Sequence, residues 1–330
     1  MKTKRIRIAV VGAGSMGERH ARFLNDCDGV DLVGIVDSNF SKAEKLSLEL
    51  GCMPYQFAEQ VVGKIDAVTI ATPPTFLAKT GSLFINAGIP PLIEKPVAVS
   101  LEEFNDLVNL SARLSVPFFV GLLESFSPAI KVAQEYLVNA DIYSISCQRI
   151  NPEGNRITDS DVLTDLLLHD LNNTVRFIKS EPICIDVYSS TLNKEKFAQH
   201  AISILRFADG RIAQFVSSRL FMTERRTFEL SSSLGTIQID LKNQIVQVFN
   251  LCEASSGVDK LNKRPSLCVE TLPTRYENPL HNELKAYVND IRNKKISNSI
   301  EGKSIAPLMK ILWEAQRKLK QSQEKIWKSE

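Results

Sequence analysis

The sequence predicts an α/β protein in which a doubly wound parallel sheet is followed by an α/β domain with an open, largely antiparallel sheet. Residues up to about 121 alternate short apolar runs with helical stretches, which is typical of βα units in a parallel sheet. From about residue 183 onward, β-type segments separated by turns dominate, as in antiparallel sheets. The length of 330 residues suits two domains, which we place at residues 1–122 and 123–330.

Strands and helices alternate through the first domain. The apolar runs predict five strands, and the segments between them predict helices. Ser100, followed by two glutamates, suits the N-cap of the last of these helices. The expected strands are 5–11, 31–37, 66–71, 91–94 and 117–121, and the expected helices are about 15–26, 41–50, 76–87 and 100–114.

The second domain begins with a helix near 128–138, an alternating strand at 143–149 and a helix at about 161–178. Asp209-Gly210 lies between two alternating segments and is a strong hairpin signal, and Gly235 marks a second turn. The strands expected after these elements are 183–190, 201–207, 211–221, 228–233, 236–240 and 244–249. A polar surface loop at 253–265 and helices at about 280–294 and 302–321 complete the chain.

A glycine-rich turn follows the first predicted strand. Residues 5–11 lead into Gly12-Ala-Gly14-Ser-Met-Gly17, a G-x-G-x-x-G turn between a strand and a helix. Gly12 permits the tight turn, Gly14 lets a pyrophosphate approach the backbone, and Gly17 lets the helix pack on the strand. The helix N-terminus then presents free N–H groups to the phosphates. This context predicts a dinucleotide site, although a glycine-rich turn alone also occurs in other α/β proteins.

An acid ends the second predicted strand, about twenty residues after the turn. Asp37 can accept hydrogen bonds from both hydroxyls of the adenosine ribose, and its charge repels a 2′-phosphate. The sequence therefore predicts NAD as the cofactor in preference to NADP. Ser38 and Asn39 are small and polar enough to tolerate a phosphate, so NADP remains the alternative.

The composition argues against several classes of partner. A net charge of +2 gives no reason to expect a nucleic acid or a membrane surface. No apolar run approaches the length of a membrane span, and the basic N-terminal residues precede a strand rather than a signal-peptide core. The six cysteines form no C-x-x-C pair, and the four histidines are scattered. We therefore expect reduced, mostly buried thiols, no metal site and a cytoplasmic protein.

Two further clusters carry ionisable groups. Glu94-Lys95-Pro96 follows a predicted strand, and doubly wound sheets bind ligands at the carboxyl ends of strands, so Lys95 is expected to project toward the nicotinamide. Asp165 and His169 are four residues apart and share one helical face beside a run of leucines. Taken alone, Lys95 also suits a surface cation, and the Asp165–His169 pair also suits a salt bridge or a helix cap.

Taken together, these motifs resemble one family. Gly12-Ala-Gly-Ser-Met-Gly-Glu-Arg-His20, Asp37, Ala71-Thr-Pro-Pro74, Glu94-Lys-Pro96 and Asp165-Leu-Leu-Leu-His-Asp170 occur in the order of the Gfo/Idh/MocA oxidoreductases. The resemblance covers at least residues 5–178. It implies a Rossmann domain that binds NAD(P), an open-faced α/β domain, and a sugar or polyol held between them, with Lys95, Asp165 and His169 as catalytic residues. The cofactor-binding residues it implies are Gly12, Gly14, Ser15, Met16, Gly17, Asp37, Ala71, Thr72, Pro73, Glu94 and Lys95.

Within the family, residues 121–128 and 149–157 resemble bacterial UDP-N-acetylglucosamine 3-dehydrogenases and their relatives. Three positions depart from the pattern: Leu122 and Leu77 stand where many relatives have histidine, and Ser125 stands where the subgroup has arginine. These departures concern the identity of the substrate and leave the catalytic set intact. The substrate-binding residues implied by the resemblance are Lys95, Arg149, Arg156, Asp165, His169 and Asn172.

The expected reaction is hydride transfer between a secondary alcohol of a sugar and the nicotinamide. A histidine ordinarily titrates near pH ~6.5, so His169 suits the base that takes the hydroxyl proton, with Asp165 orienting it and Lys95 stabilising alkoxide character. Lys95 and His169 could exchange the acid/base role. A free polyol such as an inositol is the alternative substrate. A non-catalytic NAD-sensing regulator is the alternative class, although a regulator does not need all three residues.

The second domain also predicts assembly. Residues 211–221 mix apolar and polar side chains on both parities, so neither face of that strand is purely solvated. We expect helices to cover one face of the second sheet and the other face to form a homo-oligomer, a dimer or a tetramer. A monomer with a polar second face is the alternative.

Overall fold

The computed structural model describes residues 5–152, 161–190, 197–252, 266–294 and 300–328. The chain divides into two compact units, Met1–Leu123 with Asn278–Met309, and Glu124–Glu277 with Lys310–Glu330. The domain boundary placed at residue 122 stays a prediction. The division into units adds that a segment near the C-terminus packs with the N-terminal residues.

The first unit is built on a six-stranded sheet with the strand order β3–β2–β1–β4–β5–β6. Every neighbouring pair is parallel, and the order reverses between β1 and β4, as in dinucleotide-binding folds. The predicted α/β class is confirmed, and β3 is a short edge strand that the sequence did not indicate. The strands are β1 (Ile6–Val11), β2 (Val30–Val36), β3 (Met53–Tyr55), β4 (Ala67–Ile70), β5 (Pro91–Glu94) and β6 (Phe119–Gly121).

Helices flank this sheet. The last of the predicted βα helices begins at the expected cap, since Ser100 Oγ accepts the backbone N–H of Glu103 at 3.2 Å. The helix α7, from late in the sequence, packs against α1 and β1. The hydroxyl of Tyr287 on α7 lies 2.8 Å from the carbonyl oxygen of Pro90, just before β5. The helices are α1 (Ser15–Asp26), α2 (Phe40–Leu50), η1 (Ala58–Val61), α3 (Pro74–Asn86), α4 (Leu101–Leu114) and α7 (Pro279–Asn293).

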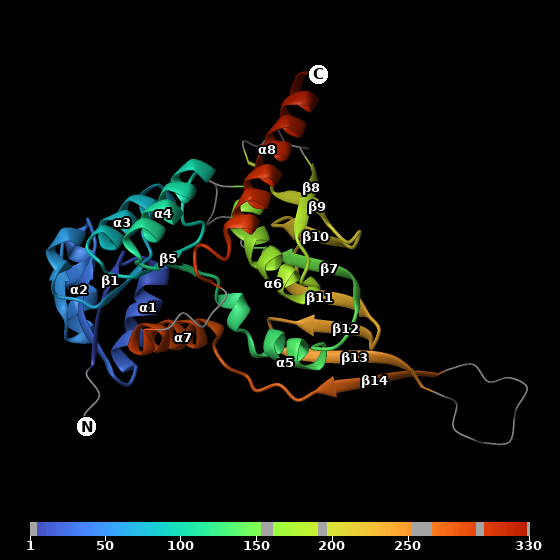
Figure 1. Cartoon of the computed structure of the whole chain (residues 1–330), viewed down its shortest axis with the longest axis horizontal. Coiled ribbons are helices and arrows are strands. Elements are labelled where there is room, and N and C mark those ends of the chain that lie inside the picture. Colours follow the sequence, from blue (N-terminus) through green and yellow to red (C-terminus); the bar gives the residue numbers. More distant parts are fainter. Residues whose placement is uncertain (1–4, 153–160, 191–196, 253–265, 295–299, 329–330) are drawn as a thin grey trace, which may run out of the picture. The chain divides into compact units, whose positions relative to one another are not determined.

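The second unit contains an eight-stranded mixed sheet in the order β14–β13–β12–β11–β7–β10–β9–β8 (Figure 1). Within the described strands of this second sheet, only β7 and β10 pair in parallel, and the other pairs are antiparallel. The hairpin predicted at Asp209-Gly210 joins β9 to β10, and Gly235 begins β12 next to β11. The strands are β7 (Ile142–Ile150), β8 (Pro182–Ser189), β9 (His200–Phe207), β10 (Ile212–Ser218), β11 (Arg225–Ser232), β12 (Gly235–Asp240), β13 (Ile245–Cys252) and β14 (Ser266–Leu272).

One face of this second sheet is covered by helices. α6 (Leu168–Ile178) packs on β7, and α5 (Pro128–Tyr136) packs on β12 and β13. In β10, Ala213, Phe215 and Ser217 are therefore buried, while Ile212 and Gln214 on the opposite parity are exposed. A 3₁₀ turn η2 (Leu123–Phe126) leads into α5, a π-helical turn η3 (Leu163–Leu167) leads into α6, and α8 (Ala306–Lys328) ends the described chain.

The cysteines differ from expectation at one place. Cys252 in β13 and Cys268 in β14 form a disulfide, with a Cα–Cα separation of 5.8 Å, inside the usual range for such bonds. The expectation that all thiols are reduced is therefore wrong for this pair, because antiparallel pairing brings together residues that share no local motif. Cys147 is buried, and Cys27, Cys52 and Cys184 are half-buried thiols. In the described part of the chain, no helix is long and apolar enough to cross a bilayer.

Candidate active site

The turn between β1 and α1 combines tight packing with an open backbone. Gly12 has a φ of +103°, and a Cβ on it would overlap the carbonyl oxygen of Ala71. A Cβ on Gly17 would overlap the carbonyl oxygen of Gly12. At Gly14, in contrast, no atom lies within 4 Å of the place a Cβ would take. The turn thus leaves its backbone open to a ligand at Gly14 and excludes side chains at its base.

The helix that follows offers N–H groups to an anion. Gly14 is the N-cap of α1 and provides no side-chain cap, so the first N–H groups of the helix, at Ser15 and Met16, need an external acceptor. The partial positive charge of a helix N-terminus adds to their attraction for phosphate.

Asp37, directly after β2, is held in place by the backbone. Its Oδ2 accepts the N–H of Ala13 at 2.7 Å, and its Oδ1 accepts the N–H of Asn39 at 2.9 Å. Each carboxylate oxygen has two acceptor sites, so both oxygens retain the capacity to accept a hydroxyl. The carboxylate is therefore oriented before any ligand arrives.

These residues line one cavity of about 680 Å³, a volume typical of small-molecule and cofactor sites. It runs from Asp37 past the glycine turn and Ala71-Thr72-Pro73 to Glu94 and Lys95. Of the cofactor residues implied by the resemblance, all but Gly17 line the cavity, and Gly17 lies buried beneath the turn. Ser38 and Asn39, which leave NADP as the alternative cofactor, also line the cavity. The lining residues that sequence analysis did not name are Val11, Val36, Lys42, Gln56, Phe57, Ala58, Glu59, Phe76 and Thr80.

The Glu94–Lys95 end of the cavity lies at the carboxyl end of β5. The Lys95–Pro96 peptide bond is cis, an isomer that is found almost only before proline. Glu94 is only 8% exposed, and its Oε1 lies 3.2 Å from Nε2 of the buried His20 on α1. Glu94 and Lys95 thus both line the cavity, and the Glu94 carboxylate also contacts the buried His20.

The second unit carries the other predicted catalytic pair. Asp165 lies in the π-helical turn η3 and His169 in the first turn of α6. π-helical turns are rare and are frequent at functional sites. His169 is buried, and Asp165 is 11% exposed at its side chain. The Thr164 hydroxyl in the same turn accepts a hydrogen bond from Gln316 of α8 at 2.6 Å, which fixes the turn against that helix.

An arginine that sequence analysis missed contacts Asp165. Arg219 follows β10, is buried, and places its Nη2 3.2 Å from Oδ2 of Asp165. Its Nη1 lies 3.3 Å from Oε1 of Gln199. No local motif marks Arg219, because its contact with Asp165 spans 54 positions of sequence and depends on how β10 ends.

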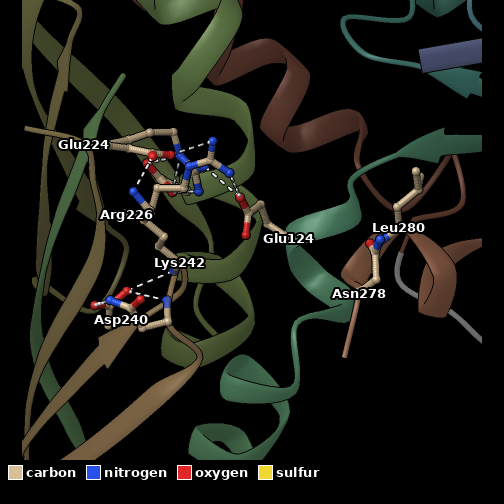
Figure 2. A network of polar contacts seen from close by, with 10 residues as sticks. Glu124, Glu224, Arg226, Asp240, Lys242, Asn278 and Leu280 are labelled. Carbon is tan, nitrogen blue, oxygen red and sulfur yellow. Dashed lines mark hydrogen bonds and ion pairs between the residues drawn. The ribbon is translucent and has the colours of Figure 1, made fainter. Parts of the chain in front are cut away.

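Arg149 is the centre of a buried ionic network in the second unit. It is 4% exposed, and its Nη2 and Nε contact Asp170 at 2.7 and 3.0 Å while its Nη1 contacts Glu124 at 2.9 Å. Figure 2 shows the extension of this network through Glu124 to Arg226, which pairs at 3.4 Å with Glu124 and at 3.0 Å with Glu224. Burial alone would lower the pKa of Arg149, but the charges of Asp170 and Glu124 outweigh it and raise that pKa.

Asn172, a predicted substrate residue, and the two leucines that depart from the subgroup pattern are all buried. Asn172 on α6 is buried and donates to the Ser125 hydroxyl at 2.6 Å. Leu122 and Leu77 are buried apolar residues. Arg156 lies outside the described residues, as does the loop predicted at 253–265.

The structure thus groups the predicted cofactor residues in the first unit, with Lys95 among them, and Asp165, His169, Arg149 and Asn172 in the second unit. Among the residues described, no group of three or more His, Cys, Asp or Glu side chains is arranged to hold a metal ion.

Comparison with known proteins agrees with this geometry. Residues 6–122 match the GFO_IDH_MocA family, described as an oxidoreductase family with an NAD-binding Rossmann fold. UDP-N-acetylglucosamine 3-dehydrogenase of Acidithiobacillus ferrooxidans is 24% identical over 286 residues, which cover 87% of this chain and 88% of that protein. Its solved structure superimposes with a TM-score of 0.87 over 97% of this chain and 99% of the other, at 20% identity.

Two other proteins are similar to this chain over most of its length. Inositol 2-dehydrogenase 1 of Mycolicibacterium vanbaalenii is 27% identical over 258 residues, 73% of this chain and 74% of that protein. The structure of GenD2 from gentamicin A biosynthesis in complex with NAD has a TM-score of 0.80 at 20% identity, covering 96% of this chain and 95% of the other. The family match, the glycine turn and the cavity that ends at Lys95 agree, and residues 6–122 form an NAD-binding Rossmann domain of the Gfo/Idh/MocA oxidoreductase family.

Proposed function

We propose that this oxidoreductase is a sugar dehydrogenase that oxidises a secondary alcohol of a nucleotide sugar, or reduces the corresponding ketone. The observation that carries the proposal is a continuous cavity in the first unit that joins the glycine turn and Asp37 to Glu94 and Lys95. Gly14 leaves the backbone open where a pyrophosphate would approach, and Asp37 is already oriented. These residues fit NAD, which when bound supplies the hydride acceptor or donor.

The protein's own part in the reaction is to bind, orient and move a proton. We assign the acceptance of the hydroxyl proton to His169, because a neutral imidazole is a suitable base at neutral pH. Lys95 donates a hydrogen bond to the reacting oxygen and stabilises its alkoxide character. Asp165, held by Arg219 at 3.2 Å, orients the imidazole or a neighbouring hydroxyl. Lys95 and His169 can exchange roles in this scheme without changing the residues required.

The substrate class is the finer part of the proposal. A nucleotide sugar is supported by the similarity to UDP-N-acetylglucosamine 3-dehydrogenase over 87% of the chain. The second candidate is a free polyol, which is supported by the similarity to an inositol 2-dehydrogenase over 73% of the chain. Arg149 was assigned to substrate binding from the resemblance, but its guanidinium is committed to Asp170 and Glu124. We therefore propose that Arg149 acts indirectly: through its contact with Asp170, it holds α6, the helix that carries His169.

One experiment separates these possibilities. The purified protein is mixed with NAD and, in parallel, with UDP-sugars, free sugars and inositols, while the absorbance of the reduced cofactor is followed. Turnover of a UDP-sugar with little turnover of inositols supports the first candidate, and the reverse supports the second. NAD binding with no turnover of any alcohol would favour a regulator that senses the nucleotide.

We also propose that the chain assembles through the exposed face of its second sheet. On this face, Ile202 lies between Val216 of β10 and Tyr188 of β8 in the strand register. Ile202 and Tyr188 are exposed and Val216 is half-buried, so an apolar row crosses three strands opposite the helix-covered face. Apolar rows of this kind mark protein interfaces, and a homodimer or homotetramer would cover it.

A further inference from the structure

A buried cluster of two carboxyl groups and a histidine lies at the Lys95 end of the cofactor cavity, and the proposed proton transfer assigns no role to these three side chains. It consists of His20 on α1, Glu94 at the end of β5 and Glu283 on α7, all in the first unit. His20 and Glu283 are fully buried, while Glu94 also lines the cavity. Burying two carboxyl groups together is costly unless at most one of them is ionised.

The surroundings of Glu94 hold its carboxyl group in one position. Its Oε1 lies 3.2 Å from Nε2 of His20, and its Oε2 accepts the backbone N–H of Lys95 at 3.3 Å. A Cβ on Gly121 of the neighbouring strand β6 would come within 2.9 Å of this carboxyl group, so only glycine leaves it room. Hydrogen bonds from two donors favour the ionised form of a carboxyl group.

The other two members of the cluster are best described as neutral. Nδ1 of His20 has no hydrogen-bond partner among the described residues, so an imidazolium would leave a buried N–H unsatisfied, whereas the Nε2–H tautomer uses its only N–H on Glu94. The carboxyl group of Glu283 has no close hydrogen-bond partner among the described residues. Burial first, and the charge of Glu94 second, raise the pKa of Glu283 well above its ordinary value, and the backbone N–H of Leu122 opposes that rise only in part.

The Glu94 carboxylate lines the part of the cavity where the nicotinamide ring is expected. Asp37 and the glycine turn mark the adenosine and pyrophosphate parts of the cavity, so the nicotinamide half extends toward β4 and β5, where Glu94 and Lys95 line the wall. The oxidised nicotinamide ring carries a positive charge that the reduced ring lacks. We propose that the Glu94 carboxylate, held by His20, is the electrostatic partner of the oxidised ring and makes the site favour NAD⁺ relative to NADH.

The proposal rests on the proposed placement of the cofactor and concerns only the balance between its two redox forms. Its test is therefore binding rather than turnover: the Kd values of NAD⁺ and NADH are measured by calorimetric titration for the unmodified protein, Glu94→Gln and Glu283→Gln. Both variants replace a buried carboxyl group with an amide of the same shape. Glu283→Gln is the matched control, because an amide closely resembles the protonated acid.

We expect Glu94→Gln to raise the ratio Kd(NAD⁺)/Kd(NADH) by about tenfold, the effect of one charge acting through a partly screened site, with the Kd of NADH nearly unchanged. Glu283→Gln should leave the ratio within about twofold of the unmodified protein. An equal loss of affinity for both nucleotides in Glu94→Gln would overturn the proposal, because it would indicate a structural role. A shift in Glu283→Gln but not in Glu94→Gln would overturn it by assigning the charge to Glu283. If neither nucleotide binds the unmodified protein, the cofactor site itself is wrong and the proposal fails with it.

Discussion

Replacing Arg149 with methionine should destabilise the second unit strongly. Arg149 is 4% exposed. Within the described residues, only Arg149 pairs Asp170 with a cation, at 2.7 and 3.0 Å. Arg149 also pairs with Glu124 at 2.9 Å. Methionine fills a similar volume but leaves two buried carboxylates facing each other. Removing one partner of a buried ion pair costs about 3–5 kcal/mol, so we expect the free energy of unfolding to fall by about that amount.

The neighbouring Arg226 provides a matched control. It faces Arg149 in the pairing of β7 with β11, and it also contacts Glu124, at 3.4 Å. Its side chain is 37% exposed, and ion pairs of exposed groups contribute about 0–1 kcal/mol. Arg226→Met should therefore lower the free energy of unfolding by no more than about 1 kcal/mol.

The assay is urea-induced unfolding followed by tryptophan fluorescence. Both tryptophans of the chain, Trp313 and Trp327, lie in α8 within the residues grouped with the second unit, so the signal reports on that unit. A midpoint for Arg149→Met close to that of Arg226→Met would refute the reasoning. Normal stability combined with a raised KM for the sugar would instead restore the assignment of Arg149 to substrate binding.

The loss of stability in Arg149→Met should depend on pH. Burial raises the pKa of Asp170, and the charge and hydrogen bonds of Arg149 oppose that rise, so removing Arg149 should raise the pKa further. A carboxyl group whose folded-state pKa exceeds its unfolded value stabilises the fold fully below the unfolded pKa and loses that contribution as the pH rises through the folded pKa. The stability deficit of Arg149→Met should therefore shrink as the pH is lowered from about 7 toward the unfolded pKa of an aspartate, about 3.9. A deficit that grows on acidification would contradict this.

Three further changes test other parts of the structure. Asp37→Ala should weaken NAD binding by about 10- to 100-fold and reduce the preference over NADP, because a charged hydrogen-bond partner of the ribose contributes about 1.5–3 kcal/mol. Tighter binding of NADP than of NAD by the unmodified protein would contradict the role of Asp37. Gly17→Val should lower the melting temperature by several degrees, since its side chain would overlap the carbonyl oxygen of Gly12; an unchanged melting temperature would mean that the turn can relax. Ile202→Asp should reduce the mass measured by light scattering to that of one chain, and a monomeric unmodified protein would rule out the proposed oligomer.

The sequence predicted the first unit well because its signals are local. Each buried strand is a short apolar run, and the glycine turn and Ser100 mark helix starts through their own backbone needs. The strand β3 was missed because it has only three residues, including a proline. The strand β14 was missed because six of its seven positions are exposed, so it lacks the alternation that identifies a half-buried strand.

The features that the sequence could not predict are all long-range. Arg219 contacts Asp165 across 54 positions, and Cys252 meets Cys268 because β13 and β14 pair antiparallel. The buried partnership of His20 with Glu94 spans 74 positions. The motif placed His20 on a helix and Glu94 after a strand, but only the packing of α1 beside the sheet shows that the two side chains meet.

The most direct test of the proposed function is the rate of NAD reduction with the best alcohol from the substrate panel, measured for the unmodified protein, Lys95→Ala and His169→Ala. We predict that both variants still bind NAD in a calorimetric titration but lose turnover by about 10²–10⁴-fold, the usual cost of removing a positioned acid or base. A His169→Ala protein that turns over at nearly the unmodified rate would contradict the assignment of the base. An unmodified protein that binds NAD and oxidises none of the sugars or polyols would contradict the proposed activity.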